Sequence, residues 1–432
     1  PGHHDQVREG PGLSEGRPWL TPRLVVLCGA AALLGLTPAS PATAQDPAPE
    51  IQELLAVRAE AMLEGDRAGF LATVDDADAV FVERQRRLFD GFQDLGLASY
   101  RLDLTTRYWP ELTTSRERSR YGTVADPHLF HVEERYRLPG YDPEPALEDL
   151  FLTFIRRDDR WVVASDTDLD DLTLYSGRKL WENGAIITRR SDHFLYVSHP
   201  DLASASGTIL ELAERALDRV DQRWPLEWHQ RVPILAPSST EELRRIIQAT
   251  FDLDVFVAFA YSGVDRARGW DLVGHRIILN WPNFSRFPDT TQESILSHEL
   301  LHIATREYNG PAVATWVDEG VAEWVSGDAD DFYLSEAVVE RTFDRRLPRD
   351  YEFITGPDDA ILGAYEESSA GARYAVERFG SEAVADFYRL IGRARVAPGT
   401  SGFHVDRAML AAWGVSFDAF QTLWADWVED EV

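Results

Sequence analysis

Residues 290–327 read TTQESILSHELLHIATREYNGPAVATWVDEGVAEWVSG, with apolar residues recurring at helical spacing. In the first half, Thr290 and Glu293 predict a capping box at the start of a helix with a buried apolar face. The second half predicts a buried helix, because its apolar residues recur at helical spacing, at positions 316, 317, 321, 322, 324 and 325. Gly320 lies inside that second helix and has no side chain, so we expect another helix to pack closely against it.

The first helix contains His298-Glu299-Leu300-Leu301-His302, an H-E-x-x-H pattern. His298 and His302 are four residues apart, so they project from one helix face, one turn apart. Two imidazoles so placed can both bind one tetrahedral zinc ion at about 2.0–2.1 Å. Glu299 is offset by about 100° around the helix axis, where it can meet a water on the metal. The alternative is a solvated helix face that carries two histidines by chance.

The second helix offers a third ligand. Sixteen residues separate His302 from Glu319, and an acid inside a buried helix is costly unless it is paired or binds a metal. Catalytic zinc needs a third protein ligand and an open fourth position, and Glu319 is well placed as that ligand. Glu323 follows one turn later on the same face, where its carboxylate can accept the free N–H of a ligand histidine.

HELLH followed by WVDEG resembles the pattern of the gluzincin zinc metallopeptidases, specifically the peptidase-MA-like group. The resemblance implies that His298, His302 and Glu319 bind Zn2+. It implies that Glu299 is the general base and acid, and that Glu323 is an acidic residue supporting the ligands. The spacer is slightly shorter than in the best-known aminopeptidases, and no G-x-M-E-N-type segment lies upstream. We therefore do not expect N-terminal trimming of substrates.

The same resemblance extends over residues 176–432. It implies a mixed sheet, an active-site helix and a helical C-terminal subdomain at 330–432. The family often uses a tyrosine or histidine to stabilise the oxyanion, which makes Tyr365 and Tyr374 candidates, with Tyr365 favoured. For each tyrosine the alternative is a core residue. His275 is interpreted as a strand residue, and the other histidines outside the motif as structural or exposed.

These residues predict a zinc-dependent metallopeptidase that hydrolyses peptide bonds in a peptide or protein substrate. The alternative is a non-catalytic gluzincin homologue that binds a ligand or partner through its N-terminal domain. A purely structural zinc site would need a fourth protein ligand and would leave Glu299 unexplained. The sequence does not determine whether cleavage is internal or terminal, nor the oligomeric state.

Residues 51–175 predict a separate α+β domain. A helical pattern at 51–72 precedes strand-like segments, and RRDDR predicts a polar hairpin turn between the last two. The strand-like segments are 100–109, 129–138, 150–155 and 161–164. Helices followed by a curved antiparallel sheet resemble the nuclear-transport-factor-2-like (SnoaL-like) fold, by element order alone.

Residues 176–265 read as mixed α/β, which makes the whole chain α+β. Ser239 with the acids after it predicts a helix start. Strands are expected at 185–188, 194–198, 231–236, 254–261 and 275–280, and helices at 207–222 and 239–250. Residues 365–432 are helical in pattern, with an aromatic stripe typical of a core.

Residues 1–44 predict a signal peptide. A basic flank precedes the apolar run LVVLCGAAALLGL at 24–36, and Ala42-Thr43-Ala44 fits a cleavage site. Residues 45–50 read as a linker. We expect a secreted or cell-envelope protein without stable membrane insertion after cleavage, or a membrane-anchored one if the run is retained. The single cysteine, Cys28, lies in this segment, so a metal would be held by His, Asp or Glu.

The charge balance excludes a class of partner. Lys+Arg number 43 against 73 Asp+Glu, a formal net charge of −30. Such a surface repels phosphate backbones, so we expect no nucleic-acid partner.

Overall fold

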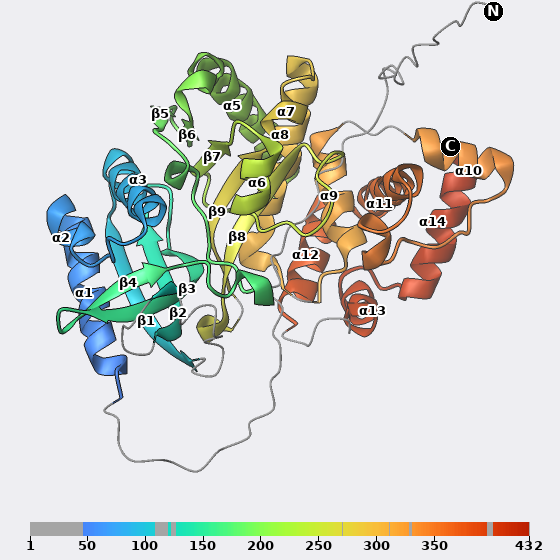
Figure 1. Ribbon diagram of the computed structural model, residues 1–432. Coiled ribbons are helices and arrows are strands. Elements are labelled where there is room, and N and C mark those ends of the chain that lie inside the picture. The colour runs from blue at the N-terminus through green and yellow to red at the C-terminus, as the bar shows by residue number, and fades with distance from the viewer. Residues whose placement is uncertain are drawn as a thin grey trace, which may run out of the picture.

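The structure, a computed structural model, describes residues 46–108, 120–121, 127–269, 271–310, 312–327, 331–394 and 401–431. The chain is α+β, as predicted: an antiparallel sheet, a mixed sheet and a helical C-terminal part follow one another across the molecule (Figure 1). The predicted signal peptide, with Cys28, lies outside the described residues. Among the described helices, none is both long and apolar enough to cross a membrane.

The first domain places three helices before a four-stranded antiparallel meander in the order β1-β2-β3-β4. Asp158 and Asp159 form the turn between β3 and β4 with φ of 48° and 61°, the positive values that a two-residue type I′ turn requires. The predicted polar hairpin turn is therefore confirmed. The elements are α1 (Ala48–Glu64), α2 (Arg67–Leu71), α3 (Ala79–Leu95), β1 (Ser99–Tyr108), β2 (His128–Arg137), β3 (Ala146–Arg157) and β4 (Arg160–Ser165).

Residues that follow β4 also pack into this first domain. Trp181 lies edge-on to Phe92 and Tyr136, with ring centroids 5.1 and 6.4 Å away. Lys179 forms a buried ion pair with Glu134 of β2. Residues 179–181 thus pack against α3 and β2 of the first domain before the chain enters the second sheet.

The second sheet is mixed and has the order β5-β6-β7-β9-β8. Its central pairs β6–β7 and β7–β9 are parallel, and both outer pairs are antiparallel. Helices α5 and α8 lie against each other, α5 contacting β6 and α8 contacting β8 and β9. The elements are β5 (Ile187–Arg190), β6 (Phe194–Ser198), α5 (Ser206–Arg223), β7 (Val232–Ala236), α6 (Thr240–Ile246), β8 (Ala258–Asp265), β9 (Asp271–Leu279), α7 (Trp281–Phe284) and α8 (Asp289–Thr305).

Several boundaries differ from the sequence prediction. The helix expected at 51–72 is divided into α1 and α2, because Gly65 ends α1 with a φ of 72°. Helix α6 begins as predicted, with the Ser239 hydroxyl accepting the Glu242 N–H at 3.2 Å, but it ends at Ile246. The strand expected at 254–261 is β8, and it starts only at Ala258. The preceding loop is held by Asn280, whose amide donates to the Leu253 and Phe256 carbonyls.

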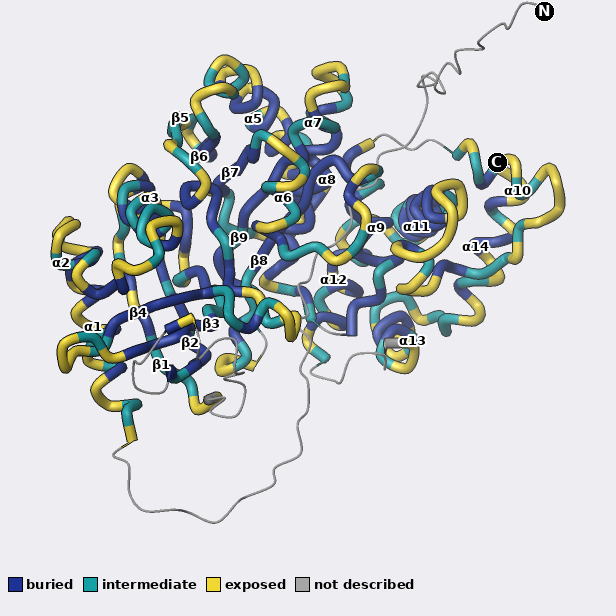
Figure 2. The backbone as a smooth tube through the Cα atoms, viewed as in Figure 1, coloured by how far each residue is buried: buried dark blue, intermediate teal, exposed yellow. Residues whose placement is uncertain are grey.

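The remaining chain is helical, and its aromatic residues form a core, as predicted. Trp413 stacks on Phe379 with centroids 4.8 Å apart, and Trp316 stacks on Phe420 at 6.1 Å. Figure 2 shows that α8 is buried along most of its length and that the middle of α11 is largely buried. The elements are α9 (Thr315–Ser326), α10 (Phe332–Glu340), α11 (Asp358–Phe379), α12 (Ser381–Gly392), α13 (Ser401–Ala412) and α14 (Phe417–Glu431).

Candidate metal centre

Helix α8 carries both motif histidines, but it does not begin with the predicted capping box. It starts at Asp289 after Pro288, so Thr290 already lies inside the first turn, where it cannot cap. Glu293 instead pairs with Arg215 and Arg219 of α5, at 2.7 and 2.6 Å. The capping-box prediction is wrong, and Glu293 instead links α8 to α5.

Helix α9 carries the third residue of the group and is held close to its neighbours. Arg219 and Arg223 of α5 donate to carbonyls at the end of α9, Arg219 to Ser326 at 2.6 Å. A Cβ on Gly320 would lie 2.3 Å from the Ser368 carbonyl oxygen of α11. The close helix contact predicted at Gly320 is therefore present, between α9 and α11.

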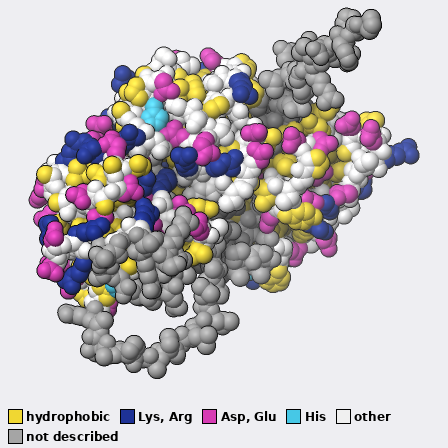
Figure 3. All heavy atoms as spheres, viewed as in Figure 1, with side chains coloured by type: hydrophobic (Ala, Val, Ile, Leu, Met, Phe, Trp, Pro, Cys, Tyr) yellow, Lys and Arg dark blue, Asp and Glu magenta, His cyan; other side chains and the backbone are white. Residues whose placement is uncertain are grey.

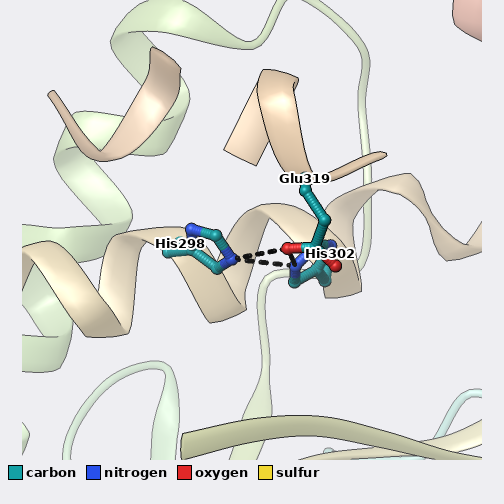
Figure 4. A group of neighbouring side chains, drawn as sticks. All are labelled: His298, His302 and Glu319. Atoms are coloured by element: carbon teal, nitrogen blue, oxygen red, sulfur yellow. Dashed lines mark hydrogen bonds and ion pairs between the residues drawn. The ribbon is translucent and has the colours of Figure 1, made fainter. Parts of the chain in front are cut away.

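The two helices bring His298, His302 and Glu319 together (Figure 4). The Nε2 atoms of the two histidines are 3.0 Å apart. Glu319 Oε2 lies 3.3 Å from His298 Nε2 and 3.4 Å from His302 Nε2. All three side chains are buried, and their ligand atoms form a nearly equilateral triangle.

This triangle could hold a metal ion. In tetrahedral coordination at about 2.0–2.1 Å, neighbouring ligand atoms lie about 3.3–3.4 Å apart. The three distances, 3.0, 3.3 and 3.4 Å, are close to that spacing. Two imidazole nitrogens facing each other with a carboxylate between them form a donor set that a cation satisfies.

The other ring nitrogen of each histidine faces a carboxylate. Glu323 Oε1 lies 3.1 Å from His298 Nδ1, the contact that its spacing led us to expect. Asp318 Oδ2 lies 3.4 Å from His302 Nδ1. Both carboxylates are placed to keep Nε2 directed at the triangle.

Asp318 was not assigned a role from the sequence. It is buried, and its other oxygen accepts hydrogen bonds from the Tyr388 hydroxyl and, at 3.4 Å, from Asn309. The signal that could have found it is the acid directly before Glu319 in a helix whose neighbours are apolar. Tyr388 and Asn309 carry no such signal, because they come from other segments of the chain.

Glu299 lies on α8, which packs against β8, the edge strand of the second sheet. The carboxylate is fully buried, and among the described residues neither oxygen has a hydrogen bond of good geometry. The backbone of Ala260 in β8 is near enough to lower its pKa, as are His298 and His302. Burial outweighs them and raises the Glu299 pKa to about 6.

The charges of the ligand residues depend on one another. Burial alone would lower the pKa of His302, but Glu319 and Asp318 outweigh it and raise it to about 9. Burial would raise the pKa of Glu319, but the two histidines hold it below its usual value. In the absence of metal the triangle therefore retains protons that a bound cation would displace.

Of the two candidate tyrosines, the structure brings only Tyr365 to the site. Its hydroxyl is buried and has no hydrogen-bond partner among the described residues. Burial, followed by Glu319, Glu323 and Glu299, raises its pKa, so it stays protonated. Tyr374 packs against Phe420 and Trp427, within the aromatic core of the helical part.

The other histidines of the described chain are bound elsewhere or lie apart from the triangle. His275 lies in β9, with Nδ1 2.9 Å from the Ser262 hydroxyl. Three more pair with acids within 2.6–2.8 Å: His131 with Asp149, His193 with Glu214, and His199 with Glu242. Their structural interpretation agrees with these contacts.

No protein-family model matches the chain, and no curated protein sequence matches it significantly. The resemblance to the gluzincins therefore depends on the motif residues of the sequence.

Proposed function

We propose that this protein is a zinc-dependent hydrolase that cleaves peptide bonds, of the gluzincin type. The observation that carries the proposal is the buried triangle of His298, His302 and Glu319, with the Glu299 carboxylate beside it and unused by other side chains. A structural zinc site would need a fourth protein ligand, whereas three potential ligands converge among the described residues.

Two imidazole nitrogens and one carboxylate oxygen at this spacing favour zinc over harder ions. Ca²⁺ and Mg²⁺ prefer oxygen ligands in larger number. When bound, zinc lowers the pKa of a coordinated water toward 7 and polarises a carbonyl group. Glu323 and Asp318 hold the histidines in the tautomer that leaves Nε2 free to bind.

Glu299 would take the proton of the attacking water and pass it to the leaving amine. Its burial favours both steps, because a carboxyl whose pKa lies near 6 can accept and release a proton near neutral pH. The Tyr365 hydroxyl, lacking another partner among the described residues, would donate to the oxyanion that develops on the substrate carbonyl. The substrate is a peptide or protein, encountered outside the cytoplasm if residues 1–44 act as a signal peptide.

The test compares wild type with Glu299→Gln on a diverse peptide library, with zinc supplied and products identified by mass spectrometry. Glu307→Gln is a matched control, because Glu307 is an exposed glutamate just beyond the same helix. The proposal is supported if wild type and Glu307→Gln cleave peptides and Glu299→Gln does not, while all three proteins bind one zinc ion. Zinc binding without cleavage by any of them would favour the non-catalytic homologue.

A further inference from the structure

The first domain makes backbone contact with the β8–β9 hairpin of the second sheet. A Cβ on Gly263 of β8 would lie 2.3 Å from the Leu147 carbonyl oxygen. A Cβ on Gly274 of β9 would lie 2.4 Å from the Ala146 Cβ. Both contacts involve the start of β3, so only glycine fits at these two positions of the hairpin.

Side chains fix the same contact on both strands. Asp142, just before β3, binds the buried Arg276 of β9 with both carboxylate oxygens, at 2.5 and 2.9 Å. The Tyr261 hydroxyl of β8 donates to Glu148 of β3 at 3.2 Å. A bidentate arginine–carboxylate pair restrains direction as well as distance, so these contacts set an orientation.

The restrained residues are next to a strand position that is hydrogen-bonded to the segment after α8, the helix that carries Glu299. Tyr261 and Arg276 are register partners, and the adjacent pair is Ala260 and Ile277. The Ala260 carbonyl accepts a hydrogen bond from Arg306 of the segment after α8 at 2.9 Å, and α8 itself packs against β8. On the other side of Tyr261, the register shifts before Gly263.

The position of β8 therefore needs support from outside its own sheet. Among the strands that the structure describes, β8 pairs only with β9, and that ladder is interrupted beside Tyr261. An edge strand with one irregular ladder can shift relative to a helix packed beside it. The first domain limits such a shift of β8, because β3 contacts Gly263 and Tyr261 of this strand.

We propose that the first domain positions the catalytic base: by holding the Tyr261–Arg276 pair, it fixes β8 against α8, the helix that carries Glu299. Asp142 is a positioning residue in this scheme and touches neither metal nor substrate. This inference rests on the proposed function for its catalytic consequence. Its structural part, that docking of the first domain restrains β8, can be tested independently.

The experiment uses full-length Asp142→Asn, together with the milder Arg135→Gln, which removes a 2.7 Å ion pair with Asp265 at the end of β8. Asp168→Asn is the matched control: this buried carboxylate of the first domain accepts hydrogen bonds from Tyr121, Thr153 and Ser165. Peptide cleavage, bound zinc and hydrogen exchange of residues 258–265 are measured for each. We expect kcat to fall about 10- to 100-fold in Asp142→Asn, with zinc retained and exchange in β8 faster.

The outcomes separate the two proposals. Unchanged exchange in β8 for both docking variants would overturn the inference, whether or not the protein cleaves peptides. An equal fall in kcat for Asp168→Asn would also overturn it, because general destabilisation would then explain the loss. Faster exchange in β8 in a protein whose wild type cleaves nothing would support the restraint and count against the proposed function alone.

Discussion

Tyr365 has a buried hydroxyl near a group of carboxylates, without a hydrogen-bond partner among the described residues. If it donates to the oxyanion, Tyr365→Phe lowers kcat by about 10²- to 10³-fold, the usual cost of removing one such donor. Its zinc content stays at one equivalent, because Tyr365 lies outside the triangle. Steady-state kinetics and metal analysis measure both effects.

The same variant distinguishes a donor from a core tyrosine. Removing a hydroxyl that makes no hydrogen bond should leave the free energy of unfolding unchanged or slightly higher. A loss of stability together with an unchanged kcat would identify Tyr365 as a packing residue. Tyr374→Phe, in the aromatic core, is the control and should retain full activity.

If the triangle binds zinc, Asp318 would act on the metal through His302. With its carboxylate removed, His302 Nδ1 loses the acceptor that fixes the tautomer and the ring orientation. We expect Asp318→Ala to weaken zinc affinity about 10- to 100-fold, and Tyr388→Phe to weaken it less. Competition with a chelator of known affinity measures this. Unchanged affinity in Asp318→Ala would exclude the orienting role.

At the scale of helices, the α9–α11 contact fixes where Glu319 lies. In Gly320→Ala the new methyl would lie 2.3 Å from the Ser368 carbonyl oxygen, so one helix must move. We expect the free energy of unfolding to fall by about 1–3 kcal/mol, the usual cost of overpacking, and zinc affinity to fall with it. Denaturant unfolding with and without zinc measures the change.

Gly363→Ala provides the control for this helix contact. Gly363 also lies within a helix, α11, but the nearest atom to its added methyl is Tyr333 Cβ at 3.9 Å. Alanine there is expected to raise stability by up to about 1 kcal/mol, since glycine is the poorer helix former. Equal losses in both variants would show that the contact at Gly320 is not specific.

The sequence predicted those elements whose signal is local. The Asp158-Asp159 turn and the Ser239 cap formed as expected, because their hydrogen bonds and dihedral angles involve neighbouring residues. The start of β8 was placed four residues too early, because the loop before it is fixed by Asn280, far along the chain. Helix α3 was not predicted, although its Asp78 cap accepts the N–H groups of Val80 and Phe81.

For the whole molecule, metal binding should couple to stability. Without a cation, two Nε2 atoms 3.0 Å apart and a buried carboxylate share protons. A metal that binds only the folded chain raises the free energy of unfolding by about 2.7 kcal/mol at a free concentration 100 times its Kd. Thermal unfolding should therefore shift upward with zinc and downward with chelator. His302→Gln should show neither shift, and equal shifts in that variant would mean that zinc binds elsewhere.

The candidate site was predicted more completely than its surroundings. His298, Glu299, His302, Glu319 and Glu323 could be proposed because helical spacing places them on known faces of two helices. What the first domain contributes could not be predicted. The pairing of Asp142 with Arg276 joins residues 134 positions apart, and nothing in the local pattern of either indicates the other.

That contact between domains also predicts a pH dependence. Glu148 is partly buried between β3 and β8; burial and then Glu134 raise its pKa to about 7, although Lys179 opposes them. A glutamate in the unfolded chain titrates near about 4.3, so between these pH values the folded state binds more protons. Stability from this group therefore falls as pH rises from about 4.3 to 7 and stays lower above it. Glu148→Gln removes the effect, so its melting temperature relative to wild type should be higher at pH 8 than at pH 5. The control is Glu336→Gln, an exposed change on α10, whose melting temperature relative to wild type should be the same at both pH values. If the difference in melting temperature between Glu148→Gln and wild type is also independent of pH, the prediction is wrong.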